Sequence, residues 1–504
     1  MHRLFYATIF YFAFGSGTTT SNPQKARILF TTSPVLSHLK GSLDLANELK
    51  RRGYESISFA LPDDEIARRT VEREGFKMHG LGSYDRRRLE NIFTNMSRAT
   101  SLYEQVYLFG LITNEQLNRH GGPFDELLSS VEFDLIVADY FAPMDAVASA
   151  TKRDVPLVEF HTAVPLDDVF LQDVQLYGYF DNSTSFVKRL GRALRFVASA
   201  VTSVCVLWSR GVAFNHLLMQ RPPHRYAIHF SFPGFRYPGS VRFPATTVNV
   251  GFSVDVFRSS DVTAATDLEL REWLDKNDKV IYVSFGVLVR PYFEVLAAIV
   301  RGALASVKNA RVLVSTRDRA DLEKMLGRAD NVRLENWVNQ QMVLMHRSTV
   351  AFVTHGGPRS LGEAMTSRVP VLVVPHYGDQ LLHGCLVERY GLGLQLHKTN
   401  VSLDFVRDRL VTILARREEM QENLEQMDRL RVLSGGVGRG ADLIELVLIA
   451  DSDNIIPYGA DLQFLAAWNV DVWLFFSVCL YVGIRLILTL GRRLRRENEK
   501  SKKD

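Results

Sequence analysis

Cysteine is scarce in this chain, with three among 504 residues: Cys205, Cys385 and Cys479. Three cysteines do not build a disulfide framework, and their spacing matches no metal site. Net charge is also low, since 60 Lys and Arg against 56 Asp and Glu leave +4. The tail 491–504 holds seven basic and three acidic residues and accounts for all of that excess. The remaining chain is neutral, so nothing predicts a nucleic-acid-binding face.

Repeats of short period are absent, which excludes a solenoid architecture. Hydrophobic residues make up 46% of the chain and charged residues 23%. These proportions are typical of globular proteins and exclude a mostly disordered chain, a collagen and a multi-span membrane protein. The length exceeds what one ordinary core of roughly 150 residues fills, so two or three domains are expected.

The N-terminal end carries a short apolar run. Residues 4–14 are apolar, follow the basic start Met1-His2-Arg3 and precede the small residues Gly15-Ser16-Gly17. This pattern predicts a signal peptide over 1–17, because spanning a bilayer needs about 20 residues. A buried first strand is the alternative, and the polar sequence that follows disfavours it.

The C-terminal end carries a longer run. Residues 472–490 contain one charge, Arg485, and the basic tail 491–504 follows. The pattern predicts a transmembrane helix with a cytosolic tail, preceded by a juxtamembrane segment over 451–471. A buried core helix is the alternative, but it leaves the basic tail unexplained.

Two further features bear on location. Lys500 and Lys502 resemble the dilysine retrieval signal of endoplasmic-reticulum membrane proteins. Asn95, Asn182 and Asn400 begin sequons that a lumenal domain would expose to glycosylation. We therefore expect a single-pass type I protein of the endoplasmic-reticulum membrane, with its main body in the lumen.

The body of the chain alternates short apolar runs with helical stretches. The expected strands are 26–30, 57–61, 134–139 and 155–160 in the first half, and 279–285, 310–316, 350–357 and 369–375 in the second. A helix is expected over 43–53, ending at Gly53. Runs without polar interruption indicate strands of parallel sheets covered on both faces.

A segment rich in proline and glycine, 232–253, lies between the halves and predicts a linker. The expected architecture is α/β, with two doubly wound Rossmann-like domains over 18–240 and 241–450 and a ligand cleft between them. The apolar run 196–208 is either a buried core helix or a patch that touches the bilayer.

The segment 337–380 is the richest in candidate ligand groups. A strand ends at His355-Gly356-Gly357, and a helix opens with Ser360. Small residues at such a turn let backbone amides approach a ligand, and a helix N-terminus favours an anion such as a diphosphate. We expect His355 to donate to a phosphate oxygen and Glu363 to accept from ribose hydroxyls.

Three more residues of this segment suit the rest of a nucleotide sugar. Trp337 offers a flat face to a nucleobase, and Asp379 and Gln380, after another strand, can bind sugar hydroxyls. Each residue alone is weak evidence, since a single Trp or His is usually structural. Their order and spacing together carry the prediction.

This pattern resembles the signature of the UDP-glycosyltransferase superfamily. Gln340 lies three residues after the Trp, His-x-Gly begins eighteen after it, Glu363 lies eight after the His, and Asp-Gln follows sixteen later. The two ends further resemble the membrane-anchored, animal-type UDP-glucuronosyltransferase class. The resemblance implies the GT-B fold, no metal, no cofactor other than the donor substrate, and a donor site formed by the following residues: Ser284, Gly286, Trp337, Val338, Gln340, His355, Gly357, Arg359, Ser360, Glu363, Asp379 and Gln380.

Two positions depart from that signature. Arg359 stands where the family usually has Asn, so it either pairs with the diphosphate or blocks it. The family's Ser-x-Gly-Ser loop is Ser284-Phe285-Gly286-Val287 here, and its second hydroxyl is lost.

The first half is expected to supply the acceptor site and the base. His38 lies in the expected loop after the first strand, and Asp139 ends the strand 134–139. Both lie at the carboxyl edge of one sheet, so they can meet, and they match the family's catalytic His–Asp pair. His161 is weighed as an acceptor contact, although an ordinary loop residue fits its position better.

These features predict an inverting glycosyltransferase that moves a sugar from a UDP-sugar to the hydroxyl of a lipophilic small molecule. Glucuronic acid and glucose both remain open as the sugar, the acceptor is not identified, and homo-oligomerisation stays open. One alternative is a non-catalytic GT-B-like protein that binds a lipid or a partner, and Arg359 and Val287 favour it. A nucleotide-sugar epimerase is a further alternative, which the membrane anchor and the context of His38 disfavour.

Overall fold

The computed structural model describes residues 23–139, 149–150, 152–162, 226–232, 234–235, 247–254, 265–327 and 329–450, with scattered positions between 474 and 489. The expected signal peptide 1–17, the apolar run 196–208 and the basic tail lie outside these residues. Among the residues described, no helix combines the length and the apolar character that crossing a bilayer requires. Nine of the nineteen residues of 472–490 lie outside them, so the membrane span stays a prediction.

The first domain contains a seven-stranded sheet in which every pair of neighbours is parallel, in the order β3-β2-β1-β4-β5-β6-β7. Its strands are β1 (Ile28–Thr31), β2 (Ile57–Asp63), β3 (Lys77–Ser83), β4 (Leu135–Asp139), β5 (Leu157–His161), β6 (Tyr226–His229) and β7 (Thr247–Asn249). All residues of β1 and β4 are buried, as expected for central strands covered on both faces. The four strands predicted in this half are confirmed.

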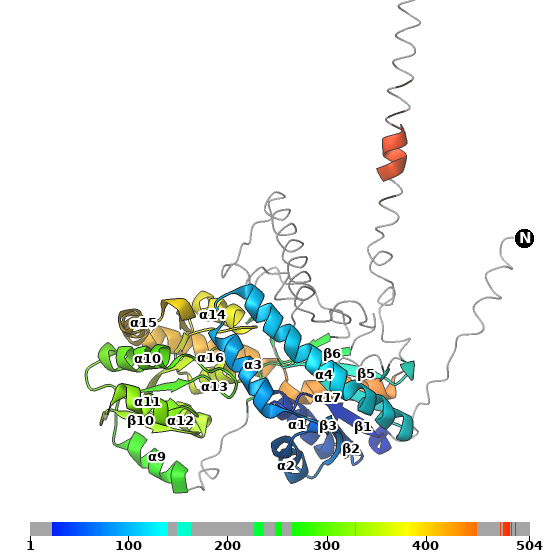
Figure 1. Cartoon of the computed structure of the whole chain (residues 1–504), viewed down its shortest axis with the longest axis horizontal. Helices are drawn as coiled ribbons and strands as arrows, with labels where there is room; N and C mark the ends of the chain where they lie inside the picture. The colour runs from blue at the N-terminus through cyan, green and yellow to red at the C-terminus, as the bar shows by residue number, and fades with distance from the viewer. Residues whose placement is uncertain are drawn as a thin grey trace, which may run out of the picture.

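The second domain contains a six-stranded parallel sheet in the order β10-β9-β8-β11-β12-β13. Its strands are β8 (Val280–Ser284), β9 (Arg311–Ser315), β10 (Val332–Glu335), β11 (Thr349–Thr354), β12 (Val371–Val373) and β13 (Gly393–Gln395). Figure 1 shows the two domains side by side, the first mainly in blue and cyan and the second mainly in green and yellow. The four strands predicted in this half are also confirmed.

In both sheets the strand order reverses beside the first strand of the domain. The first sheet changes direction between β1 and β4, and the second between β8 and β11. Ligands of open α/β sheets bind outside the carboxyl ends of the strands at such switch points. His38 and Asp139 follow β1 and end β4, while Gly286 and His355 follow β8 and β11.

Helices cover both sheets. They are α1 (Leu36–Arg51), α2 (Glu65–Arg73), α3 (Arg86–Arg98), α4 (Leu102–Ser130), α9 (Ala265–Asp275), α10 (Phe293–Ser306), α11 (Arg319–Leu326), α12 (Gln340–Met345), α13 (Pro358–Ser367), α14 (Gln380–Arg389), α15 (Leu403–Ala415), α16 (Arg417–Leu433) and α17 (Gly436–Ile449), with short 3-10 turns at Pro23–Lys25 and Lys398–Asn400. The helix expected over 43–53 begins earlier, at Leu36. His38 therefore lies in the first turn of α1, and its prediction as a loop residue is wrong.

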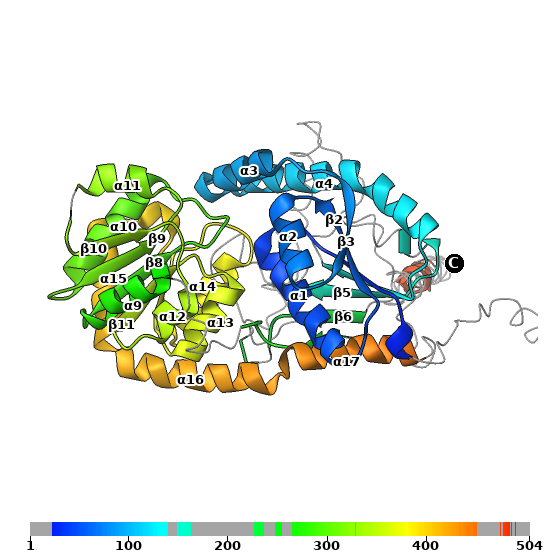
Figure 2. The same cartoon turned by 90° about the horizontal axis from the view of Figure 1, so that it is seen from below.

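Two segments expected in the second half belong structurally to the first domain. β7, within the expected linker, adds an edge strand to the first sheet. α17 buries Ala441, Leu443 and Ile444 in the core of that domain. Arg52 at the end of α1 holds α17 through Asp442 and Glu445, at 2.7 and 2.6 Å. Figure 2 shows α16 and α17 running along one side of both domains, so the chain returns to the first domain after completing the second.

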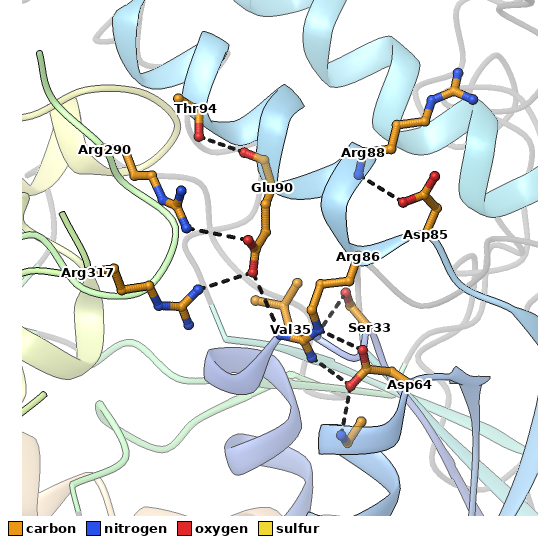
Figure 3. Close-up of polar contacts among 11 residues, drawn as sticks. Ser33, Val35, Asp64, Asp85, Arg86, Arg88, Glu90, Thr94, Arg290 and Arg317 are labelled. Atoms are coloured by element: carbon orange, nitrogen blue, oxygen red, sulfur yellow. Dashed lines mark hydrogen bonds and ion pairs between the residues drawn. The ribbon is translucent and has the colours of Figure 1, made fainter. Parts of the chain in front are cut away.

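On the opposite side, α3 of the first domain reaches the second domain (Figure 2). Glu90 accepts hydrogen bonds from Arg290 and Arg317, which follow β8 and β9, at 3.4 and 3.1 Å. Figure 3 shows these contacts beside the paired Arg86 and Asp64 of the first domain. The domains are therefore joined on both sides of the space between the two switch points.

Candidate functional site

The carboxyl edge of the first sheet brings His38 and Asp139 together. Nδ1 of His38 lies 2.8 Å from Oδ2 of Asp139. The His38 side chain is 16% exposed, whereas that of Asp139 is fully buried. A buried carboxylate that accepts from Nδ1 fixes the neutral tautomer in which Nε2 carries the lone pair. The pair is thus arranged for proton abstraction by Nε2.

Two threonines complete this arrangement. The hydroxyl of Thr32 donates to Oδ2 of Asp139 at 3.0 Å, and the hydroxyl of Thr162 lies 2.9 Å from Nδ1 of His38. Gly41, one turn after His38, permits the approach of Thr162, because a Cβ at this position would lie 3.0 Å from Cγ2 of Thr162. Neither threonine was predicted, since a hydroxyl after a strand is too common to mark a site.

The electrostatic environment raises the pKa of His38 above its ordinary value of 6.5. Burial acts in the opposite direction, but the charge of Asp139 and its hydrogen bond to His38 together outweigh it. The charge of Asp379 adds to the effect from the other domain. Asp379 follows β12, so the two sheet edges lie close enough for their charged groups to interact.

In the second domain, two glycines make room for His355. Gly286 has a φ of +68°, and a Cβ there would lie 3.0 Å from Cε1 of His355. A Cβ on Gly357 would lie 2.5 Å from Nε2 of the same ring. The loops after β8 and β11 therefore meet at this imidazole, with Ser284 Oγ 3.5 Å from the amide of Gly286.

Burial, with the charge of His383 as a second cause, lowers the pKa of His355 to about 4. The imidazole is therefore neutral at pH 7 and keeps one N–H to donate. Beside it, α13 begins with Gly357 as its N-cap and Pro358 at its first position, and no described side chain caps this end. A neutral donor and a helix N-terminus together suit an anionic group.

Glu363 lies inside α13 within a hydrogen-bonded network. The amide of Gln340 donates to Oε2 of Glu363 and also lies 3.2 Å from the Ser360 hydroxyl. The phenol of Tyr282 donates to the side-chain oxygen Oε1 of Gln340 at 3.2 Å. The structure thus brings together three of the predicted residues, and Tyr282, which was not predicted, orients them.

Trp337 and Val338 differ in accessibility. Trp337 is 72% exposed, in the turn between β10 and α12. Its indole face is therefore accessible to a ligand. Val338 is buried in the core of the second domain, so its side chain packs against the protein interior.

The adjacent residues Asp379 and Gln380 have different environments. Oδ2 of Asp379 is buried and has no hydrogen-bond partner among the described residues. The side-chain oxygen Oε1 of Gln380 instead accepts from the backbone amides of His376 and Tyr377, at 2.9 and 3.3 Å. Asp379 retains capacity for a ligand hydroxyl, whereas Gln380 also shapes the loop that leads to it.

The remaining predictions concern His161, a metal ion and Arg359. His161 is 5% exposed, and its Nε2 lies 3.4 Å from Oε2 of Glu159. The described residues contain no cluster of three His, Cys, Asp or Glu side chains suited to a metal ion. Arg359 contacts Glu363 and also Asp44 of α1, two partners that sequence reasoning did not foresee.

Comparison with known proteins supports the interpretation of the second domain. Residues 239–431 match the family described as UDP-glucoronosyl and UDP-glucosyl transferase. The chain is 38% identical over 146 residues to UDP-glycosyltransferase 708G2 of Citrus unshiu, which covers 26% of this chain and 30% of the citrus protein. It is 35% identical over 156 residues to the ecdysteroid UDP-glucosyltransferase of Choristoneura fumiferana defective polyhedrosis virus, covering 29% of this chain and 31% of the viral protein.

A UDP-glycosyltransferase of Talaromyces amestolkiae is 26% identical over 322 residues, which are 55% of this chain and 59% of the fungal protein. The chain thus spans less than two thirds of each of these relatives. They come from a plant, a virus and a fungus, so they support the broad superfamily and not specifically the animal membrane-anchored class.

Solved structures are similar over most of the chain. The calicheamicin glycosyltransferase CalG4 has a TM-score of 0.58 and 21% identity, covering 84% of this chain and 98% of that one. The glycosyltransferase of kitacinnamycin has a TM-score of 0.57 and 19% identity, covering 84% and 99%. These similarities confirm the expected GT-B fold with two Rossmann-like domains.

Proposed function

We propose, from the match of residues 239–431 to the UDP-glycosyltransferase family and from the geometry of the residues that follow the strand ends of both domains, that this chain is an inverting UDP-sugar-dependent glycosyltransferase. The acceptor is the hydroxyl of a lipophilic small molecule. The observation that carries the proposal is the pairing of His38 with the buried Asp139, close enough to Asp379 of the donor domain for the charge of Asp379 to act on His38. A protein that only binds a nucleotide sugar has no use for an oriented base at this position.

The chemistry follows from the positions of the groups. Nε2 of His38 takes the proton of the acceptor hydroxyl as its oxygen attacks the anomeric carbon. The bond from that carbon to the diphosphate oxygen breaks on the opposite face, and UDP leaves with the bonding electron pair. Asp139 stabilises the imidazolium that forms. One displacement of this kind inverts the anomeric centre.

The second domain binds the leaving group. The N-terminus of α13 and the neutral His355 face the diphosphate, and Glu363 accepts from the ribose hydroxyls. An ionised carboxylate has about four acceptor sites. Glu363 can therefore hold Gln340 and Arg359 and still accept from a ligand. Asp379 binds a hydroxyl of the transferred sugar, and Trp337 stacks on the nucleobase of the donor.

The test is transfer by the full chain from radiolabelled UDP-glucose and UDP-glucuronic acid to mixed phenols and sterols. We expect a labelled product from at least one donor, with inverted configuration by NMR. A thermal-shift assay with UDP runs in parallel, because a ligand that binds the native state raises the Tm. A raised Tm with no transfer to any acceptor supports the non-catalytic alternative instead.

We also propose a lumenal main body anchored by the apolar run 472–490, and assignment to the membrane-anchored, glucuronosyltransferase-like class. The two apolar runs and the basic tail support this topology. Protease added to sealed microsomes should spare the body until detergent is present. Digestion of the body without detergent would contradict the proposed topology.

A further inference from the structure

Arg359 lies between two carboxylates that belong to different domains. Its Nε is 3.5 Å from Oε1 of Glu363, one turn further along α13. Its Nη1 is 3.8 Å from Oδ2 of Asp44. Asp44 lies on α1, six residues after His38. The bridge Asp44–Arg359–Glu363 therefore connects the helix that carries the proposed base with the helix that binds the nucleotide.

The segment that joins the domains strengthens this connection. The hydroxyl of Ser253 donates to Oδ2 of Asp44. Gly362 of α13 has no side chain at the contact, and a Cβ there would lie 2.7 Å from Cγ2 of Val254 and 3.1 Å from Cβ of Phe252. Residues 252–254 therefore pack directly on α13 while they hold Asp44. α13 is therefore linked to α1 directly through the bridge and indirectly through residues 252–254.

The charges make Arg359 the central element of the bridge. The side chains of Arg359, Glu363 and Asp44 are 23%, 8% and 26% exposed, so solvent screens them only in part. Without the guanidinium, two carboxylates would face each other with less compensation, and like charges in a shared site disfavour ionisation. A neutral residue such as Asn, which the family usually has here, forms no ion pair with either carboxylate.

We propose that Arg359 is a positioning residue that couples nucleotide binding to the placement of α1 and His38. The inference rests on the proposed function, because it assigns Glu363 to the ribose. A ribose hydroxyl that binds Glu363 redistributes the contacts of its carboxylate. Arg359 transmits that change to Asp44, so occupancy of the donor site orders the helix that carries the base. Arg359 then acts on catalysis through other residues and does not itself hold the diphosphate.

Asp44→Asn separates this role from direct phosphate binding. If Arg359 couples the domains, Arg359→Asn and Asp44→Asn each lower kcat by about tenfold to a hundredfold, since small misplacements of reacting groups are costly. The affinity for UDP changes less than about threefold in both. The double variant is no worse than either single one, because residues that act as a unit are non-additive. Arg359→Lys restores part of kcat.

If Arg359 instead binds the diphosphate, Arg359→Asn weakens UDP binding by about tenfold or more, as expected for a charged hydrogen bond. Asp44→Asn then releases the guanidinium and leaves kcat unchanged, and that pair of results overturns the proposal. Arg317→Gln is the matched control, since Arg317 also pairs across the domains, with Glu90 at 3.1 Å (Figure 3). We expect its kcat to stay within about twofold of the parent, as is usual for exposed pairs.

Hydrogen–deuterium exchange gives a readout that does not depend on turnover. UDP should slow amide exchange over residues 36–51 in the full chain and in Arg317→Gln, but not in Arg359→Asn or Asp44→Asn. Protection of these residues by UDP in all four proteins, or in none, overturns the coupling. Protection in the parent protein without sugar transfer to any acceptor leaves the coupling intact and rejects the proposed function.

Discussion

Each domain contains one buried carboxylate near its switch point, Asp139 in the first and Glu363 in the second, and the two are held in different ways. Asp139 accepts from His38 and Thr32 through a single oxygen, and its side chain is fully buried. Glu363 binds Gln340 through one oxygen and Arg359 through the other. Under the proposed function, the first arrangement adjusts the protonation of a neighbouring base, and the second holds an acceptor for hydroxyls in place. The carboxylate that ends β4 would then serve proton transfer, and the one inside α13 would serve binding.

His38→Ala removes the proposed base, which Asp139 orients, and should have the largest effect on turnover. Turnover should fall by about 10²–10⁴, the usual contribution of general base catalysis. UDP affinity, measured by calorimetry, should stay within about twofold because the nucleotide binds the other domain. If the variant keeps most of its turnover at pH 7 with an unactivated alcohol as acceptor, another residue is the base.

Asp139→Asn leaves the base but removes the charge that raises the pKa of His38. The reactive imidazole is the unprotonated form, so the rate of the parent protein falls as pH drops through that raised pKa. In the variant the pKa decreases, and the acid limb of the pH–rate profile moves to lower pH. The plateau rate should fall by about 10²-fold, since the orientation of the ring is lost while the base remains. An unmoved acid limb would show that Asp139 does not tune His38.

Glu363→Gln and Asp379→Asn separate the binding of the nucleotide from the binding of the transferred sugar. Glu363→Gln should weaken UDP by about tenfold, because a hydrogen bond to a charged group contributes roughly 1.5–3 kcal/mol. Asp379→Asn should leave UDP affinity nearly intact and impair sugar transfer, since its contact is with the sugar. Equal losses of UDP affinity in the two variants would contradict this division.

Trp337→Ala should have a smaller effect on nucleotide binding. Aromatic stacking contributes about 0.5–1.5 kcal/mol, so UDP affinity should fall by about two- to tenfold. Trp337→Phe keeps a flat ring and should recover part of the loss in a fluorescence or calorimetric titration. Unchanged affinity in Trp337→Ala would mean that this exposed indole does not contact the base.

Glu90→Gln lies outside both networks and should have the smallest effect. Its pairs with Arg290 and Arg317 are partly exposed, with side chains 27–46% accessible. Such pairs contribute about 1 kcal/mol or less, and salt screens them. The free energy of unfolding in denaturant should change by no more than that, and turnover should stay within about twofold. A tenfold loss of turnover would show that α3 controls the cleft.

The sequence predicts the four central strands of the second sheet because their signals are local. The apolar runs 279–285, 350–357 and 369–375 mark strands, and polar residues at their ends lie at one sheet edge by the geometry of parallel sheets. The motif 337–380 also lies within a single stretch of chain. The apolar runs and the spacing of the motif are therefore enough to predict that Gln340, Glu363 and Asp379 lie beyond the carboxyl ends of these strands.

Long-range contacts are less predictable. The start of α1 was missed because Pro34, Ser37 and Gly41 are typical of a loop, whereas Gly41 is required there by the approach of Thr162. α17 has a clear helical pattern, but its pattern does not say on which sheet it packs. The contact of Arg359 with Asp44 depends on the arrangement of two domains, which no local pattern encodes.

The central claim is that His38 and Asp139 act as the base pair of a UDP-sugar-dependent transferase. The most direct measurement compares the parent protein with the His38→Ala variant. Both are assayed for UDP binding and for transfer from one labelled UDP-sugar to one hydroxyl acceptor. The account predicts that both proteins bind UDP alike and that only the parent transfers sugar at an appreciable rate, with inversion. Equal transfer by the two proteins, or UDP binding by the parent protein without transfer to any acceptor, would contradict it.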